Sequence, residues 1–179
     1  MSTILTHSGL TFDFARPSAA VVRLQDIAHG LSHACRFAGQ CSTFYSVAQH
    51  AVAVSLLCPT LEALHHDDTE AYMGDMTRPL KDLIPQFKDL EWQVHGVIMQ
   101  ALGLPEEQSD ELKLADRRVY FLERQRLFSA RCPIDYEGLE PAPDWVLGAP
   151  LPPKAAKALF LARHDQLVKA RGAEVSAPK

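Results

Sequence analysis

Residues 63–75 limit most strongly how this chain can fold, because they place two histidines and four carboxylates in otherwise apolar, helix-like sequence. On a helix, Glu70 lies four residues after His66 and three after Asp67, so the three side chains can face the same way. A glycine is then expected to end the helix, and a turn could return Asp75 toward that face. Leucine, alanine and tyrosine occupy much of the segment, which leaves little room for a solvated acidic surface. The pattern therefore predicts a divalent metal site with hydrolytic carboxylates beside it.

The length and charge of the chain bound its function. A chain of 179 residues suggests a single domain over 1–179, with a hairpin arm at 1–23 and a frayed tail at 172–179. A formal net charge of −4 argues against a nucleic acid polymer as partner. The chain has neither an apolar run of about 20 residues nor a signal-peptide pattern, so we expect no membrane partner and a cytoplasmic location. The cysteines lack CxxC spacing, which favours small buried thiols over a zinc knuckle or a redox motif.

Hydrophobic spacing predicts an all-α helical bundle preceded by a possible short β-hairpin, whose turn is expected at residues 7–9. Ser46 and Gln49 have the spacing of a capping box at the start of a helix. Residues 77–81 are predicted to form a loop, because the residue before Pro79 avoids helical angles. A second loop is expected over 132–153. The predicted helices cover these ranges: 24–39, 46–57, a helix through the 63–75 cluster, 90–102, 109–128, and 155 to the tail.

Two ligands would hold a metal only weakly, so further donors are expected elsewhere in the chain. His50 lies in the first turn of the helix that Ser46 caps, which would fix its position. The alternative is a histidine that simply packs in the core. Asp116 shares a helix face with apolar residues three and four positions away, where an unpaired carboxylate would be costly. A metal ion or a buried salt bridge would each account for Asp116.

The order of His50, the His66–Asp67 pair and Asp116 on successive helices resembles the HD-domain metal-dependent phosphohydrolases. Further segments look like the branch that contains bacterial 5′-deoxynucleotidases of the YfbR type and phage deoxyadenosine triphosphate triphosphohydrolases. These segments are residues 26–31, 35–37, 45–50 and 70–75. The similarity covers roughly residues 20–130, and it is specific because ligands, helix cap and flanking acids occur in one order. The resemblance implies an HD-domain helical bundle around a divalent ion.

The resemblance also implies a role for individual residues. The metal would be held by two histidines and two aspartates: His50, His66, Asp67 and Asp116. Zinc, cobalt or manganese would suit this set best, with magnesium or iron as further options. By the same resemblance, Glu70 and Asp75 would be the catalytic acids, and Arg36 would contact the substrate phosphate. Independently of the resemblance, the position of Lys81 after Asp75 suggests a second phosphate-binding cation, and Val22 and Pro79 could form an apolar base pocket. Alternatively, Arg36 could be a surface residue at a helix end, and Lys81 an ordinary exposed lysine.

The chain departs from the family pattern at two positions. Many relatives carry histidine where this chain has Gln40, which weakens the expectation of a second metal or phosphate contact there. Asp68 adds a carboxylate after the histidine–aspartate pair, and its offset of about 200° from His66 on a helix predicts exposure to solvent. His29 and His65 are interpreted as packing or surface residues, not ligands.

The implied activity is metal-dependent hydrolysis of the 5′-phosphoester of a deoxynucleotide. One possible substrate is a deoxynucleoside monophosphate, as for a 5′-deoxynucleotidase. The other is a deoxynucleoside triphosphate, dATP in particular, which would yield deoxynucleoside and triphosphate. The short chain and residues 45–50 favour the phage-type triphosphohydrolase, which would act in the host cytoplasm if it is phage-encoded. A hypothesis from another class is a non-catalytic nucleotide sensor. The family further implies a homo-oligomer.

Overall fold

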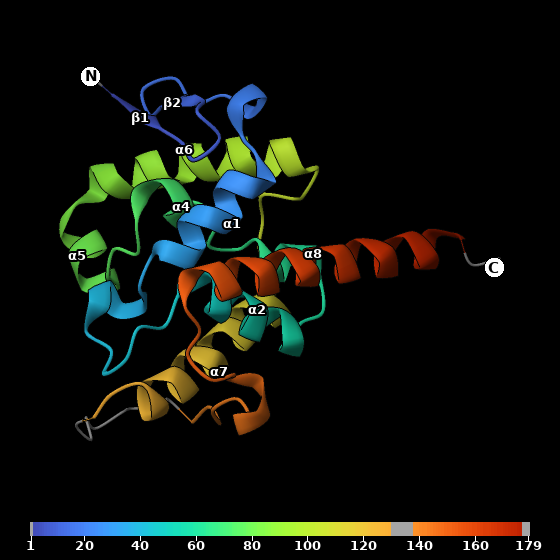
Figure 1. The fold of residues 1–179 in the computed structure, drawn as a ribbon. Coiled ribbons are helices and arrows are strands. Elements are labelled where there is room, and N and C mark those ends of the chain that lie inside the picture. Colours follow the sequence, from blue (N-terminus) through green and yellow to red (C-terminus); the bar gives the residue numbers. More distant parts are fainter. Residues whose placement is uncertain (1, 130–137, 177–179) are drawn as a thin grey trace.

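The computed structural model describes residues 2–129 and 138–176, and it is mostly helical with one small β-hairpin (Figure 1). Both features confirm the sequence-based expectation. Parts of the predicted loop and tail, at 132–137 and 177–179, lie outside the described residues. Among the described helices, none combines the length and the apolar character that crossing a bilayer requires. The elements are β1 (Thr3–Leu5), β2 (Thr11–Asp13), the 3-10 helix η1 (Ala19–Val21), α1 (Leu24–His33), the 3-10 helix η2 (Arg36–Gly39), α2 (Val47–Leu57), α3 (Leu61–Leu64), α4 (Glu70–Met73), α5 (Arg78–Leu83), α6 (Pro85–Leu102), α7 (Asp110–Arg126), the 3-10 helix η3 (Asp144–Val146) and α8 (Pro153–Ser176).

Helix α2 is the centre of the bundle, with α1, α3, α7 and α8 packed against it. Helix α8 also packs on α1 and α3, and its C-terminal part projects away from the other helices (Figure 1). Helix α4 packs on α1, and α6 packs on η1 and α5. Nine consecutive residues of α2, 47–55, are buried. A polar side chain on this helix must therefore find its partners inside the protein.

Two apolar cores share α2. The larger joins α1, α2, α6 and α8 through buried residues such as Ile27, Ile98 and Phe160. The smaller joins α2 to α7 and η3, with Val54 and Leu122 among its members. Because α2 contributes to both cores, its position relative to α7 is fixed by packing, and α7 can present side chains to it with little freedom.

The N-terminal hairpin is fastened to α1 by a buried carboxylate. Strands β1 and β2 pair antiparallel, with Thr3 opposite Asp13. Asp26, in the first turn of α1, accepts hydrogen bonds from Ser8 N and Ser8 Oγ, both at 2.7 Å. Asp26 is 5% exposed, so these bonds compensate for the cost of burying its charge.

The prediction of one continuous helix through the histidine–aspartate cluster is wrong. The chain forms two single-turn helices, α3 and α4, separated by a turn over 65–69. Side chains of this segment bond locally: His66 Nδ1 donates to Ala63 O at 2.8 Å, and His65 Nδ1 donates to Asp68 Oδ2 at 2.6 Å. Such bonds offer the chain an alternative to helical pairing, and the turn aims its side chains differently from a helix.

Three other predicted boundaries also differ. The predicted loop at 77–81 mostly lies in α5, where Pro79 sits in the first turn and its missing N–H breaks no helical bond. Helix α1 ends at His33 instead of Gly39, because the chain then becomes extended. Helix α8 continues through Gly172 to its end instead of fraying there, since one glycine costs a helix only about 1 kcal/mol.

At Gly30 the backbone of α1 packs directly against α4. A Cβ placed there would lie 2.4 Å from Ala71 O, so the backbone of α4 would have to move. We expect Gly30→Ala to lower the free energy of unfolding by about 2–3 kcal/mol, measured by urea denaturation. Gly172→Ala is the control, because a Cβ there meets nothing within 4 Å and alanine favours helix. Equal stability of the two variants would contradict the close packing of α1 on α4.

Candidate metal centre

His50 is held on α2 by the cap at the start of that helix. Ser46 Oγ accepts a hydrogen bond from Gln49 N at 3.2 Å, as predicted. The Gln49 side chain does not complete a capping box; it bonds to backbone groups of the 149–151 segment. His50 is fully buried, and its Nδ1 donates to Glu123 Oε1 at 2.9 Å. Its Nε2 finds no hydrogen-bond partner among the described residues, which a merely packed core histidine does not explain.

His66 presents a second bare nitrogen to the same place. Its Nδ1 donates to Ala63 O at 2.8 Å, and its Nε2 lacks a hydrogen-bond partner in the part of the chain that the structure describes. The next residue brings a carboxylate between the two histidines. Asp67 Oδ2 lies 3.1 Å from His66 Nε2 and 3.5 Å from His50 Nε2.

Asp116 reaches the same point from α7. Its Oδ1 lies 3.1 Å from His50 Nε2 and 3.8 Å from His66 Nε2. The ligand atoms of His50, His66 and Asp116 all lie within 4.8 Å of one another, so this cluster could bind a metal ion. With Asp67 Oδ2 facing both nitrogens, the structure brings together all four residues that the sequence suggested as ligands.

The chemistry of this donor set fits a divalent cation. Each Nδ1 proton is already donated to an oxygen, so each neutral imidazole would turn a lone pair toward carboxylate oxygens. That contact is repulsive unless a proton or a cation lies between them. A carboxylate and a carbonyl that fix the histidine tautomers are also typical of metal-binding histidines. The histidines lie inside, whereas the side chains of Asp67 and Asp116 are 25% and 36% exposed, so the centre opens on its carboxylate side.

The charges around the centre favour cations between the carboxylates. Burial lowers the pKa of His50, but the carboxylates of Glu123 and Asp116 outweigh it and raise the pKa to about 10. Burial also lowers the pKa of His66, and Asp67 reverses the effect and raises it. Without an ion, the neighbouring carboxylates favour the protonated form of each imidazole. A divalent ion would replace these protons, because a metal-binding imidazole must be neutral.

Glu70 and Lys81 lie beside the metal centre. Glu70 is 6% exposed, and its Oε2 has no hydrogen-bond partner among the described residues. Burial raises the pKa of Glu70 well above its ordinary value, and the charges of Asp67 and Asp75 raise it further. Lys81 Nζ lies 4.0 Å from Glu70 Oε1 and donates to Glu91 Oε1 at 2.5 Å. Lys81 is therefore a paired cation next to Glu70, not an ordinary exposed lysine.

Arg36 approaches from the segment after α1 and is buried, so it is not a surface residue at a helix end. After the end of α1, Cys35 pairs with Ser46 in an isolated β-bridge, and this pairing directs the following residue, Arg36, into the protein. Arg36 Nη1 lies 3.7 Å from Asp75 Oδ2, and Phe37 N donates to the same oxygen at 2.8 Å. Phe37 has a φ of 55°, a costly conformation for a non-glycine residue. The bond to Asp75 helps to hold this strained turn.

Glu123 belongs to the centre, and sequence reasoning missed it. Its side chain is fully buried on α7, with Oε1 bonded to His50 Nδ1. Its Oε2 accepts from Arg36 Nε at 3.2 Å and from Arg36 Nη2 at 2.9 Å. Glu123 lies seven residues after Asp116, two turns along the same helix face. A second carboxylate at that spacing on a face with apolar neighbours was the signal available in the sequence.

Comparison with known proteins places the chain in a family. No protein-family model matches it. It is 41% identical over 177 residues to the uncharacterized protein YfdR of Escherichia coli K12, and the match covers 96% of this chain and 98% of YfdR. The chain belongs to the YfdR family. This YfdR-family chain is also 30% identical over 183 residues to an uncharacterized protein of Rhodobacter capsulatus, covering 90% of the chain and 93% of that protein.

The other suggested site residues of this YfdR-family chain lie apart from these contacts. Val22 is buried in the larger core, whereas Pro79 is exposed on α5. A base pocket that joins them stays a prediction. Gln40 is exposed at the end of η2. His29 is half-buried and stacks on His7 with 3.7 Å between ring centroids, in keeping with a packing role.

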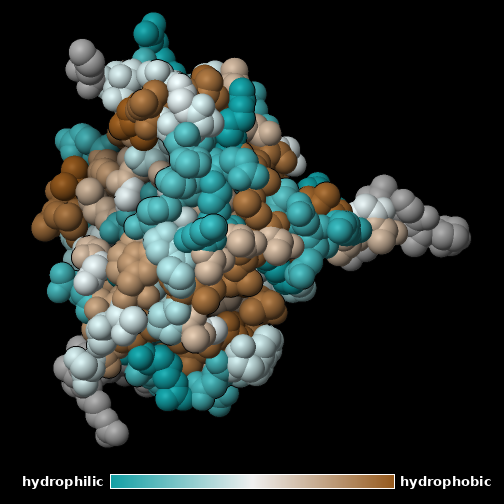
Figure 2. All heavy atoms as spheres, viewed as in Figure 1, coloured by the Kyte–Doolittle hydropathy of each residue, from teal (hydrophilic) through white to brown (hydrophobic). Residues whose placement is uncertain are grey.

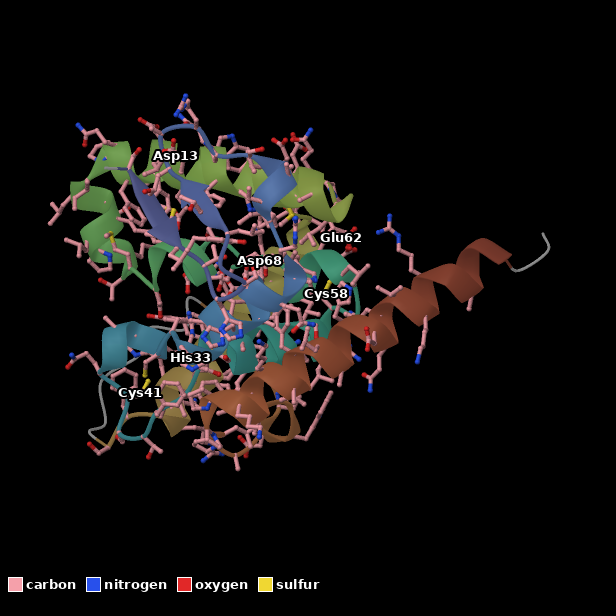
Figure 3. All side chains as sticks on the ribbon, turned by 45° about the horizontal axis from the view of Figure 1, so that its top comes forward. Asp13, His33, Cys41, Cys58, Glu62 and Asp68 are labelled. Atoms are coloured by element: carbon pink, nitrogen blue, oxygen red, sulfur yellow. The ribbon has the colours of Figure 1, made fainter. Side chains whose placement is uncertain are left out.

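The prediction that Asp68 faces solvent is wrong, because its side chain is fully buried in the interior (Figure 3). The predicted offset assumed a continuous helix, and the 65–69 turn directs Asp68 inward instead. His65 Nδ1 donates to Asp68 Oδ2 at 2.6 Å, and His65 Nε2 lies 2.9 Å from His164 Nδ1 on α8. His65 is therefore buried, and its bonds to Asp68 and His164 connect the 65–69 turn to α8. That turn carries two of the suggested ligands.

We expect the metal-free YfdR-family chain to lose stability as the pH rises from about 6.5 to about 10. The pKa of His50 is raised from 6.5 to about 10 in the folded protein, so the folded state holds its proton more tightly than the unfolded state. The stabilisation is complete below the unfolded pKa and lost as the pH rises through the folded one. The free energy of unfolding then falls by up to about 1.4 kcal/mol per pH unit for each proton. Urea denaturation with a chelator present measures it, and His50→Gln should flatten the slope; a stability that rises over this window would contradict the assignment.

Proposed function

We propose that this protein is an HD-domain metal-dependent phosphohydrolase that cleaves the 5′-phosphoester of a deoxynucleotide. The observation that carries the proposal is the meeting of two bare histidine nitrogens with two carboxylates, brought in by α2, the 65–69 turn and α7. Two further acids and two cations adjoin them. Ligands, an acid and anion-binding groups are the parts that phosphoester hydrolysis at a metal needs.

The chain's own residues supply the remaining chemistry. A bound divalent ion would polarise a phosphoryl oxygen and lower the pKa of water. Glu70 is suited to protonate the departing ester oxygen, because burial favours its protonated form. Asp75 accepts from the amide of Phe37, which fixes the carboxylate so that it can orient the attacking water. Arg36 and Lys81 would neutralise the charge on the phosphate.

Both substrate classes belong to this proposal. The phage-type activity would convert dATP to deoxynucleoside and triphosphate. One observation favours the alternative, a deoxynucleoside monophosphate: both cations are already paired, Arg36 with Glu123 and Lys81 with Glu91. A triphosphate carries more negative charge, so it would have to bring further cations into a centre rich in carboxylates. The carboxylates are Asp67, Glu70, Asp75, Asp116 and Glu123.

Product identification tests the proposal. Purified protein is incubated with a panel of deoxynucleoside mono- and triphosphates and with Mn²⁺, Co²⁺ or Zn²⁺. Triphosphate together with deoxynucleoside would support the triphosphohydrolase, and phosphate released from monophosphates would support the 5′-deoxynucleotidase. Nucleotide binding without release from any member of the panel would reject the enzyme in favour of a nucleotide sensor.

The proposal also includes a cytoplasmic location, in the host if the protein is phage-encoded, and a homo-oligomeric state. The homo-oligomer is supported by large apolar side chains at the surface: Leu80 and Leu83 on α5 are 45% and 79% exposed, and Trp92 on α6 is 57% exposed. Figure 2 shows hydrophobic residues at the surface over α5. Burial of such side chains in a subunit interface is favourable. Light scattering on the purified protein would measure the mass of the assembly, and a monomer at all concentrations would reject this part.

A further inference from the structure

The two oxygens of the Glu123 carboxylate serve different parts of the centre. Oε1 accepts from His50 Nδ1 at 2.9 Å, on the metal side. Oε2 accepts from Arg36 Nε and Nη2 at 3.2 and 2.9 Å, on the side assigned to phosphate. The Glu123 side chain has no exposed surface, and that of Arg36 is 10% exposed. Neither contact can therefore be replaced by water without moving α7.

We propose that Glu123 is a positioning residue that couples metal binding to the placement of Arg36. The coupling rests on the proposed function, because the metal and the phosphate are those of the suggested hydrolase. Through Glu123, the metal ligand His50 and the cation Arg36 share one buried carboxylate. A substitution of Arg36 should then change the affinity of the protein for the metal. The side-chain hydrogen bonds and ion pairs of Arg36 are nevertheless made with Glu123 and Asp75 and not with the four suggested ligands.

The connection continues beyond Arg36. The third guanidinium nitrogen, Nη1, lies 3.7 Å from Asp75 Oδ2, which also accepts from Phe37 N. The buried residues His50, Glu123 and Arg36 and the partly buried Asp75 are thus connected in one series, which joins α2, α7, η2 and the segment after α4. Because buried charged groups hold one another in place, a disturbance of one member spreads to the next.

Glutamine in place of Glu123 cannot make both sets of contacts. Its amide has one oxygen that accepts and one nitrogen that only donates. Either His50 Nδ1 or the Arg36 guanidinium, which both donate a hydrogen, would then face the glutamine NH2 group, which is also a donor. If His50 loses its acceptor, its ring orientation and tautomer are no longer fixed, and metal affinity falls. If Arg36 loses its acceptor, the guanidinium moves away from its position beside Asp75.

Calorimetric titration of the metal-free protein with Mn²⁺ tests the coupling without any nucleotide. We expect Glu123→Gln to weaken Mn²⁺ binding by about 10–100-fold. We expect Arg36→Lys to weaken it by at least about threefold in the native background, because one ammonium cannot reproduce the two N–H bonds to Oε2, and to have a much smaller effect in the Glu123→Gln background. Asp26→Asn is the matched control: it also alters a buried, doubly bonded carboxylate, and should leave Mn²⁺ affinity unchanged.

The outcomes separate this inference from the function on which it rests. Wild-type protein that binds no Mn²⁺ would reject the metal centre itself. Wild-type binding with an equal effect of Arg36→Lys in both backgrounds, or with no effect in either, would overturn the coupling. If Glu123→Gln does not fold, as judged by circular dichroism, Arg36→Lys decides alone: reduced Mn²⁺ affinity supports the coupling and unchanged affinity overturns it.

Discussion

Replacing His50 with alanine is expected to leave a folded protein that retains almost no metal. His50 supplies one of the two bare nitrogens and lies closest to Asp116, at 3.1 Å. Without it, the remaining donors include a single imidazole and two partly exposed carboxylates, which hold a borderline divalent ion weakly. Elemental analysis after loading with metal and dialysis measures the loss. Hydrolysis of any nucleotide that the wild type cleaves should fall with it.

His95→Ala is the matched control for this variant. His95 is also buried, at 7% exposure, but it lies on α6 and bonds to Glu106 O. Its loss removes a buried imidazole without touching the candidate metal centre. His95→Ala should therefore retain the metal content of the wild type. Full metal content in His50→Ala would show that the suggested ligand set is wrong.

Replacing Glu70 with glutamine is expected to abolish most hydrolysis while metal content stays intact. Glu70 lies three residues after the suggested ligand Asp67, and its backbone N–H donates to Asp67 O at 2.9 Å. The Oε2 atom of its side chain has no hydrogen-bond partner in the described part of the chain. Glutamine keeps the size of the side chain but cannot give up a proton to the leaving oxygen. Loss of a positioned general acid typically slows a reaction by about 10²–10⁴-fold. The rate of product release and the metal content are measured on the same preparation.

Glu62→Gln is the control for Glu70→Gln. Glu62 lies on α3 in the same segment and is more exposed than Glu70. It takes no part in the contacts around the centre that are described above. Glu62→Gln should therefore keep the wild-type rate. An undiminished rate in Glu70→Gln would remove Glu70 from the proposed mechanism, whereas loss of metal in that variant would make Glu70 part of the metal site.

Much of the fold could be predicted from local sequence patterns. The turn at 7–9 and the cap at Ser46 each have a strong local signal, and the structure places elements where these signals indicate. Predictions failed where side chains choose between local partners. The 65–69 turn replaces a helix because histidine and aspartate side chains bond nearby groups, and hydrophobic spacing does not report that competition.

The candidate site was predictable for residues whose type and spacing are informative. His50, His66, Asp67 and Asp116 were all suggested from the sequence, and the structure brings them together. Glu123 was missed, because its one sequence signal, a carboxylate two turns after Asp116 on the same face of a mostly polar helix, does not show what the carboxylate pairs with. Its role depends on Arg36, which lies 87 residues away along the chain.

By itself, the sequence determined the helical class, the hairpin and the identity of the suggested ligands, because periodicity, caps and residue chemistry act over short distances. Only the tertiary structure decided which carboxylates are buried and what they pair with. Asp68 faces inward to His65, and Glu123 joins His50 to Arg36. The physical reason is that a buried charge is tolerable only beside a partner, and such partners are supplied by segments that packing brings together from distant parts of the chain.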